Sequence, residues 1–378
     1  MIVNVSLNML VPSMPSIVRD LSTTPASVQL TMTLYLVGIA CGQLFYGPLS
    51  DRYGRRPILL IGLGGFVFAT LAALLSMSVE VLVLSRFAQA FCGCCGMVLT
   101  RAIVRDVYSR EETASALGFI TMAMVIGPAL SPLIGGVFDQ YLSWRAIFVL
   151  QASFASVVVI AVYLTLNETN YQRTTSIRVS AVARDFAALL KSPAYVGYIM
   201  SAGFTIWCFY TFLGGIPHVA AEIVGAGPVE YGAYFMLLAA GYSSGNFVSG
   251  KLANRIRLTW LIGAGLFTAT FAGGLLVAIG YLLPASLATL FLPMTVLTFG
   301  NGLSQPATIA SAISIRPEIA GSASGLMGFV QMGIAGLASL AVGLQLGSSQ
   351  MPVLMQIFAG IVVAVGFFVL AVRAEAKT

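Results

Sequence analysis

The chain has 378 residues, of which 58% are hydrophobic and only 8% are charged, with a formal net charge of +6. Soluble domains carry about 25% charged residues, so this composition excludes a soluble globular protein and predicts one embedded in a lipid bilayer. The basic residues are spread over several short segments without an aromatic, basic face, which excludes a nucleic-acid-binding protein.

Long apolar runs follow one another along the chain and predict an all-α membrane protein of twelve spans. Most runs exceed the roughly 20 residues needed to cross ~30 Å of hydrocarbon. The first run is of marginal length, lacks a preceding basic segment and contains proline, so we expect no cleavable signal peptide. The expected limits are 2–19, 27–49, 58–78, 81–104, 114–138, 145–166, 194–217, 230–252, 259–282, 287–310, 320–345 and 352–372.

The second and third spans are joined by residues 47–57, GPLSDRYGRRP. So short a connection predicts a helical hairpin with Asp51, Arg52 and Arg55 at its tip, where Gly47 and Gly54 would permit close backbone approach. A tip rich in glycine and charge indicates a segment that moves. The alternative is that its arginines only hold the loop on the cytoplasmic side of the membrane.

The fourth span contains Arg86 about five residues from its start, with Gln89 one turn further on. A cation inside the membrane costs about 3 kcal/mol on the lenient insertion scale, so we expect Arg86 to face the bundle interior or a wet cavity. The alternative is that its long side chain reaches the outer surface. Cys92, Cys94 and Cys95 follow in the same span and are interpreted as small packing residues, not as a metal site, because hydrocarbon disfavours thiolates.

Glycine and proline are concentrated in the fifth span. They are expected to bend and thin this helix so that another helix packs closely, either as a moving seam or as plain packing. The residues concerned are Gly127, Pro128, Pro132, Gly135 and Gly136.

The longest polar stretch, residues 167–193, divides the spans six and six. It predicts an N-terminal bundle over 1–166, a cytoplasmic linker with a short amphipathic helix over 179–190, and a C-terminal bundle over 194–378. Residues 47–52 resemble residues 250–255, and residues 115–118 resemble 322–325, at nearly equal offsets. These two matches indicate a duplicated six-helix unit. Most of the 19 Lys and Arg residues fall on one side if both termini are cytoplasmic, which is the orientation we expect.

Together these segments resemble the major facilitator superfamily, and within it the bicyclomycin-resistance (Bcr/CflA) group of drug:proton antiporters. Residues 47–57 are similar to the signature between spans two and three, residues 85–90 to a second signature in span four, and residues 127–136 to the antiporter signature. Residues 143–148, SWRAIF, are also typical of the group.

The resemblance implies a fold of two pseudo-symmetric six-helix bundles and multidrug efflux by alternating access. It implies a monomer in the inner membrane of a bacterium, with no cofactor and a proton gradient as the energy source. Asp51, Arg52 and Arg55 match positions that latch the two halves at the cytoplasmic side, and span five matches the seam between them.

One position departs from the group. Many relatives have an Asp before Met-x-x-Pro in the first span, regarded as the proton carrier, whereas this chain has Asn8. An amide does not titrate, and none of the 13 acidic residues lies deep in a span. Asp51, Glu222 and His218 are the remaining candidates for the proton carrier.

A cavity without carboxylates suits neutral or weakly anionic amphipathic solutes held by aromatic rings and amides. Each candidate lining residue is as well explained by hydrogen bonding between helices as by contact with a solute. The candidates are Asn8, Tyr35, Trp207, Tyr210, Tyr242, Asn246, Asn301, Gln305 and Gln331.

Two other functions are weighed against efflux. The first is an uptake symporter for a small metabolite. The second, more remote, is a non-transporting membrane sensor or a membrane enzyme. No zinc motif, nucleophile elbow or phosphate loop occurs in the sequence, so we expect no enzyme.

Overall fold

The structure is a computed structural model that describes residues 2–107, 110–170, 179–253 and 255–376. Helix covers most of each of the twelve predicted spans, and the described residues contain no strand. The chain divides into two compact units, Met1–Arg178 and Val179–Thr378. The finer boundaries at 166 and 194 stay a prediction.

The described residues of the first unit form seven α-helices, and the first predicted span is broken rather than continuous. Pro12 and Pro15 lack the N–H that a continuous helix needs, so the chain passes through a short 3₁₀ turn, η1 (Val11–Ser13), between α1 and α2. The α-helices are α1 (Ile2–Leu10), α2 (Met14–Asp20), α3 (Pro25–Tyr53), α4 (Arg55–Leu74), α5 (Val79–Val107), α6 (Arg110–Tyr141) and α7 (Trp144–Thr165).

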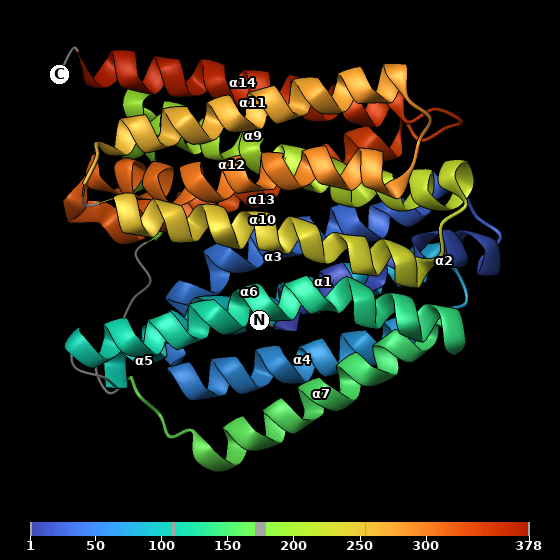
Figure 1. The fold of residues 1–378 in the computed structure, drawn as a ribbon. Coiled ribbons are helices and arrows are strands. Elements are labelled where there is room, and N and C mark those ends of the chain that lie inside the picture. The colour runs from blue at the N-terminus through green and yellow to red at the C-terminus, as the bar shows by residue number, and fades with distance from the viewer. Residues whose placement is uncertain (1, 108–109, 171–178, 254, 377–378) are drawn as a thin grey trace. The chain divides into compact units, whose positions relative to one another are not determined.

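Helix α5 packs against both α3 and α4, and α4 also packs against α7 (Figure 1). Small residues make these contacts close. A Cβ atom at Gly42 would lie 2.7 Å from Cys94 Cβ, and one at Gly62 would lie 2.5 Å from Cys95 Sγ. The two thiols also donate to the backbone oxygens of Ile39 and Leu59. These cysteines therefore act as small packing residues between helices.

The second unit begins with α8 (Val179–Leu190), which covers the predicted amphipathic helix, and Ser322 donates a hydrogen bond to Asp185 on it. Helix α12 packs against α10 and α11, while α9 packs against α13 and α14. The long helices of this unit lie side by side in Figure 1. They are α9 (Pro193–His218), α10 (Pro228–Leu252), α11 (Leu258–Leu282), α12 (Leu287–Ser314), α13 (Ala320–Gly343) and α14 (Met351–Glu375).

Hydroxyl side chains fix where several long helices begin. Thr24 accepts from the Ser27 N–H at the start of α3, and Ser192 accepts from the Tyr195 N–H at the start of α9. At α12, Ser286 and Thr289 form a reciprocal capping box. Such caps satisfy N–H groups that have no partner inside the helix, so polar residues at the edges of the apolar runs set the helix ends.

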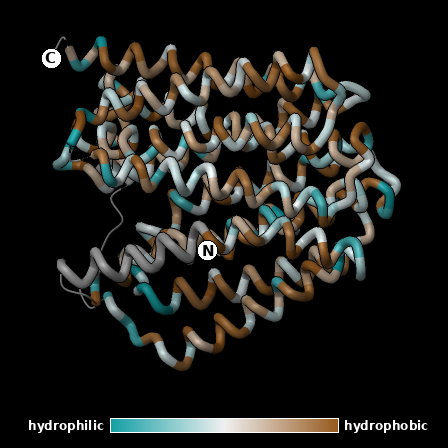
Figure 2. The backbone as a smooth tube through the Cα atoms, in the orientation of Figure 1, coloured by the Kyte–Doolittle hydropathy of each residue, from teal (hydrophilic) through white to brown (hydrophobic). Residues whose placement is uncertain are grey.

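Within the described residues, nine helices are long and apolar enough to cross a membrane. Large apolar side chains on them are exposed, including Phe68 and Phe267 at 75% each and Trp260 at 73%. Figure 2 shows hydrophobic residues along the helices, with many of the hydrophilic residues near the helix ends. Exposed apolar surface of this extent is stable against lipid rather than water.

Candidate functional site

The turn between α3 and α4 contains two glycines with different environments. Gly54 has φ +104°, a conformation that favours glycine, and it both ends α3 and precedes α4. A Cβ atom at Gly47 would meet nothing within 4 Å. The expected close backbone approach at Gly47 is therefore wrong, whereas Gly54 is explained by its backbone angle.

Arg55 joins three helices at this turn although it is only 6% exposed. Its Nη1 lies 2.5 Å from Asp51 Oδ1 on α3 and 2.6 Å from Ser50 Oγ. Its Nε lies 3.2 Å from Asp106 Oδ2 on α5. Both carboxylates therefore share one guanidinium, which holds the tip of the hairpin against α5.

Two residues at the tip differ from the sequence-based expectation. Arg52 is not part of the cluster, because its guanidinium lies over the ring of its neighbour Tyr53 at 5.1 Å. Asp106 belongs to the cluster but could not be predicted from the sequence, because it is 51 residues from Arg55 and lies near the end of another helix.

Arg86 is 1% exposed and lies inside the first unit. Its Nη1 donates to Gln89 Oε1 at 2.5 Å and to Ser6 Oγ at 3.0 Å. Its Cζ lies 3.9 Å from the centroid of the Tyr35 ring, and the Tyr35 hydroxyl donates to the Val3 carbonyl. The side chain does not reach the surface, and its cationic plane lies on an aromatic face.

The contacts around Arg86 continue through neutral side chains to further helices. Gln89 Nε2 donates to Thr70 Oγ1 on α4 at 2.7 Å and to Gln151 Oε1 on α7 at 3.0 Å. Ser6 Oγ on α1 also donates to Gln151 Oε1, at 2.7 Å. Sequence reasoning missed Ser6, Thr70 and Gln151, because isolated hydroxyls and amides are ordinary in membrane helices and only the fold brings them together.

Two carboxylates near the broken first span have opposite environments. Asp20 Oδ2 accepts from Arg145 Nη1 and from Trp144 Nε1, and the hydrogen bond from Arg145 is the main reason that the pKa of Asp20 is lowered. Asp139 Oδ2 accepts from Ser16 Oγ at 2.7 Å, and burial raises the pKa of this carboxyl group. The surroundings of Asp20 thus favour ionisation of its carboxyl group, whereas burial opposes the ionisation of Asp139.

Replacing either carboxylate by its amide is expected to change stability in opposite directions. Asp139→Asn should raise the melting temperature at pH 7, and the gain should vanish below the ordinary Asp pKa of about 3.9, where both folded and unfolded Asp139 are protonated. Asp20→Asn should lower the melting temperature at pH 7, corresponding to a loss of less than about 1 kcal/mol of stability because the pair is partly exposed. This loss should fade as the pH falls through the lowered pKa of Asp20. Melting curves of both variants between about pH 2 and pH 8 test this, and parallel pH profiles would contradict it.

Helix α6 continues through Pro128 and Pro132. Pro132 cannot donate to the carbonyl of Pro128, and Ser131 Oγ donates to that oxygen at 2.9 Å instead. Gly135 lies so close to α1 that a Cβ atom would be 1.8 Å from the Met9 carbonyl oxygen. Close packing on α1 within the first unit therefore accounts for Gly135. Gly136 is buried, and Gly127 is partly buried.

The two candidate cavity residues of the first unit have partners inside it. Asn8 is buried, its Nδ2 donates to the Asn4 carbonyl at 2.8 Å, and its Oδ1 has no hydrogen-bond partner. The ring and hydroxyl of Tyr35 are both used, by Arg86 and Val3. Asn8 is therefore the one of the two that leaves a polar atom for a solute.

In the second unit, α12 directs two amides at α9. Asn301 Nδ2 donates to the Thr205 carbonyl at 3.2 Å, and Gln305 Nε2 donates to Thr205 Oγ1 at 2.6 Å and to the Ala202 carbonyl at 3.1 Å. Asn301 Oδ1 and the Nε2 of Gln331 on α13 are buried without a partner. Asn301 Oδ1 is an acceptor and Gln331 Nε2 is a donor, so both have hydrogen-bonding capacity that no described residue uses.

The remaining cavity candidates are less deeply buried. Trp207 Nε1 donates to the Gln356 carbonyl, and Asn246 Nδ2 donates to the Tyr242 carbonyl. Tyr242 is 37% exposed, and the ring of Tyr210 packs against a neighbouring aromatic ring. These four residues remain predictions.

His218 and Glu222 lie where α9 ends in a π-helical turn, η2 (Val219–Val224). His218 Nε2 is 3.2 Å from the carbonyl oxygen of Gly347, and Glu222 is exposed. Asp51, the third candidate for the proton carrier, pairs with Arg55, but its side chain is 48% exposed. None of the three candidates is therefore buried among polar groups.

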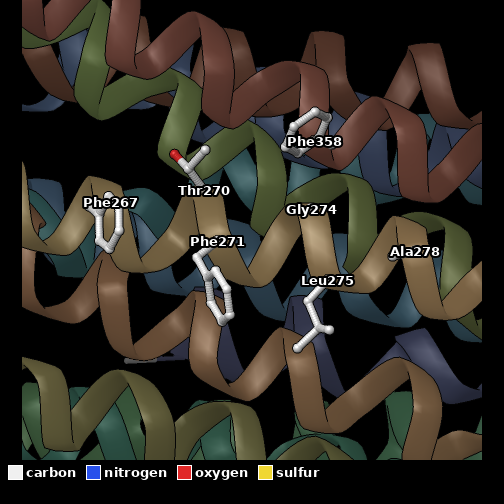
Figure 3. A pocket seen from close by; sticks show the side chains of 7 residues that line it. All are labelled: Phe267, Thr270, Phe271, Gly274, Leu275, Ala278 and Phe358. Carbon is white, nitrogen blue, oxygen red and sulfur yellow. The ribbon is translucent and has the colours of Figure 1, made fainter.

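A groove of about 400 Å³ lies on the outer side of α11 and α14 (Figure 3). Its lining is apolar except for Thr270, whose hydroxyl donates to the carbonyl of Leu266. Phe267 and Phe271, which line it, are among the most exposed apolar side chains. The groove therefore has no free polar group with which to select a solute, and it faces lipid. The lining residues are Phe267, Thr270, Phe271, Gly274, Leu275, Ala278 and Phe358.

Known proteins resemble this chain, some over most of its length and some over a part of it. The model of the family described as Major Facilitator Superfamily matches residues 1–340. A bicyclomycin resistance protein homolog of Haemophilus influenzae is 26% identical over 360 residues, covering 95% of this chain and 90% of the relative. A chloramphenicol resistance protein of Pseudomonas aeruginosa is 42% identical over 149 residues, covering 39% and 36%.

Among solved structures, a bacterial homolog of the human lysosomal transporter Spinster, in an inward-facing and unoccupied conformation, has a TM-score of 0.77. It is 19% identical, with 100% of this chain and 96% of that chain covered. At this identity the likeness shows the fold alone.

Proposed function

This chain belongs to the Major Facilitator Superfamily, and on that basis we propose that it is a proton-driven exporter of largely uncharged, drug-like solutes. It is a multi-pass membrane transporter rather than an enzyme. The antibiotics named in its relatives, bicyclomycin and chloramphenicol, give the class of solute. We further propose that the protein acts as a monomer with both termini in the cytoplasm, as the distribution of its basic residues favours.

The buried polar groups carry the proposal for an uncharged cargo. Among the described residues, the buried polar side chains are amides, hydroxyls and the two arginines Arg55 and Arg86, with no Asp, Glu, Lys or His. A lipophilic cation would find no buried counter-charge and would be repelled by Arg86. A neutral solute can use the orphaned amides of Asn8, Asn301 and Gln331 without an ion partner.

Expression in an efflux-deficient bacterial host tests this function. Tolerance to chloramphenicol is expected to rise, while tolerance to a permanently cationic dye should change much less. Unchanged tolerance across neutral antibiotics would contradict export, and inward chloramphenicol flux in proteoliposomes would favour the uptake symporter instead.

We propose that the tip of the α3–α4 hairpin is the gate of the transport cycle, because Arg55 and its two carboxylates form a cluster that a small movement can break and remake. Asp51→Asn is expected to reduce the rate of chloramphenicol export about tenfold at unchanged expression, since a charge-assisted hydrogen bond contributes roughly 1.5–3 kcal/mol. Glu318→Gln is the matched control, because it removes another ion pair, with Arg316, outside the hairpin. Normal turnover in Asp51→Asn would rule out the gate.

A further inference from the structure

The short segment after α7 lies against the turn between α3 and α4. Glu168 Oε1 accepts from the Arg55 N–H at 2.8 Å, and its Oε2 accepts from the Arg56 N–H at 3.3 Å. The same carboxylate accepts from the N–H groups of Thr169 and Asn170 at 3.0 and 2.9 Å. The carboxylate thus binds the first two N–H groups of α4.

Helix α4 has no cap of its own. The residue before it is Gly54, which lacks a side chain, and Pro57 in its first turn has no N–H. Only Arg55 and Arg56 present donors before Ile58, and Glu168 satisfies both. A negative charge at a helix N-terminus also interacts favourably with the helix dipole. Glu168 therefore supplies the cap that Gly54 cannot.

The side-chain amide of Asn170 caps the C-terminal end of α3. Asn170 Nδ2 donates to the carbonyl oxygens of Ser50 at 3.3 Å and of Asp51 at 3.0 Å, in the last turn of α3. These carbonyls lie at the negative end of their helix, where a donor is needed. Glu168 thus caps the start of α4, and Asn170, two residues further on, caps the end of α3.

Two further observations support a firm attachment. Arg56 Nη2 donates to the Tyr163 carbonyl on α7 at 2.8 Å, and its Cζ lies 5.5 Å from the centroid of the Tyr163 ring. Partial burial opposes the ionisation of Glu168, but the hydrogen bonds from the four backbone N–H groups outweigh it and lower the pKa of this carboxyl group. Glu168 therefore stays ionised at neutral pH and keeps its capping charge.

We propose that Glu168 and Asn170 are positioning residues of the gate, which fix the hairpin tip to the first residues of the segment that joins the two units. This inference rests on the gate role proposed above. Because the caps hold the backbone on both sides of Gly54, they place Asp51 and Arg55 at the distance that their ion pair needs. The position of residues 168–170 thereby sets the position of the tip.

Hydrogen–deuterium exchange of the full chain in detergent tests the positioning directly. In Glu168→Gln, amide exchange in the peptides covering residues 47–56 is expected to be about fivefold faster, the factor that corresponds to loss of one helix cap. Asn170→Ala should give a similar increase over residues 50–54. Thr169→Val is the matched control, because it removes a buried hydroxyl that has no partner and keeps the backbone N–H.

Chloramphenicol export by the same variants tests the consequence for the gate. The capping variants should reduce kcat several-fold and leave KM within twofold of the unaltered chain, because no cavity candidate is touched. Unchanged exchange in both capping variants would overturn the inference whether or not the protein exports chloramphenicol. Faster exchange with an unchanged kcat would overturn the link to the gate, whereas absence of export by the unaltered chain would overturn the proposed function.

Discussion

Gly135→Ala is expected to destabilise the first unit by about 3 kcal/mol or more, at the upper end of the range for overpacked interiors. The added Cβ atom would lie 1.8 Å from the carbonyl oxygen of Met9 and 2.8 Å from its carbonyl carbon. Both atoms belong to the backbone of α1, so no side-chain rotation relieves the contact, and α1 must move away from α6. The measurement is the melting temperature of the purified protein together with the yield of folded protein.

Two other glycines serve as controls for this substitution. A Cβ atom at Gly64 on α4 or at Gly96 on α5 would meet nothing within 4 Å. Alanine at these positions should be neutral or slightly stabilising, because Gly is the weaker helix former. A melting temperature for Gly135→Ala equal to that of the two controls would show that α1 does not pack on α6 as described.

Arg86→Met is expected to reduce export strongly while leaving the protein folded. Removing the charge stabilises the membrane-embedded protein by up to about 3 kcal/mol, the cost of placing a cation in the membrane. Loss of the guanidinium leaves Gln89 Oε1 and the Ser6 carbonyl with fewer hydrogen-bond donors, which costs about 1–3 kcal/mol of stability. The two effects nearly cancel, and methionine fills much of the space, so the melting temperature should change little. Export of chloramphenicol should fall at least about tenfold, because a buried charge in a membrane protein is retained for function.

Arg86→Lys separates charge from geometry at the same site. Lysine keeps the positive charge but cannot bridge Gln89 and Ser6 while stacking on Tyr35, so export should remain low. Unimpaired export in Arg86→Met would show that the charge is not needed. A loss of more than about 3 kcal/mol of stability in that variant would show that the network is mainly structural.

The helices could be predicted from the sequence because a membrane leaves few alternatives for a long apolar run. Hydropathy and length located the spans, and the polar stretch after residue 166 marked the division of the chain. The break in the first span was not predicted, although Pro12 and Pro15 cause it. Whether a proline breaks a helix depends on whether neighbouring groups satisfy the freed carbonyl, as Ser131 does in α6.

The candidate site was only partly predictable for a related reason. Arg86 and Asp51 are conspicuous because charges are rare in or beside apolar spans. Asp106 and Glu168 appear in the sequence as ordinary charges at the ends of helices. Both matter because they contact Arg55, which is 51 positions from Asp106 and 113 positions from Glu168 along the chain. Such contacts depend on how the helices align along their lengths, which hydropathy does not determine.

Accumulation of chloramphenicol in everted membrane vesicles shows whether a proton gradient drives export by this protein. With an imposed pH gradient, acid inside, the vesicles containing this protein should accumulate chloramphenicol, and collapsing that gradient at constant voltage should reduce accumulation to the level of control vesicles. Accumulation that persists without the pH gradient, or none above the control while the gradient stands, would contradict proton-driven export.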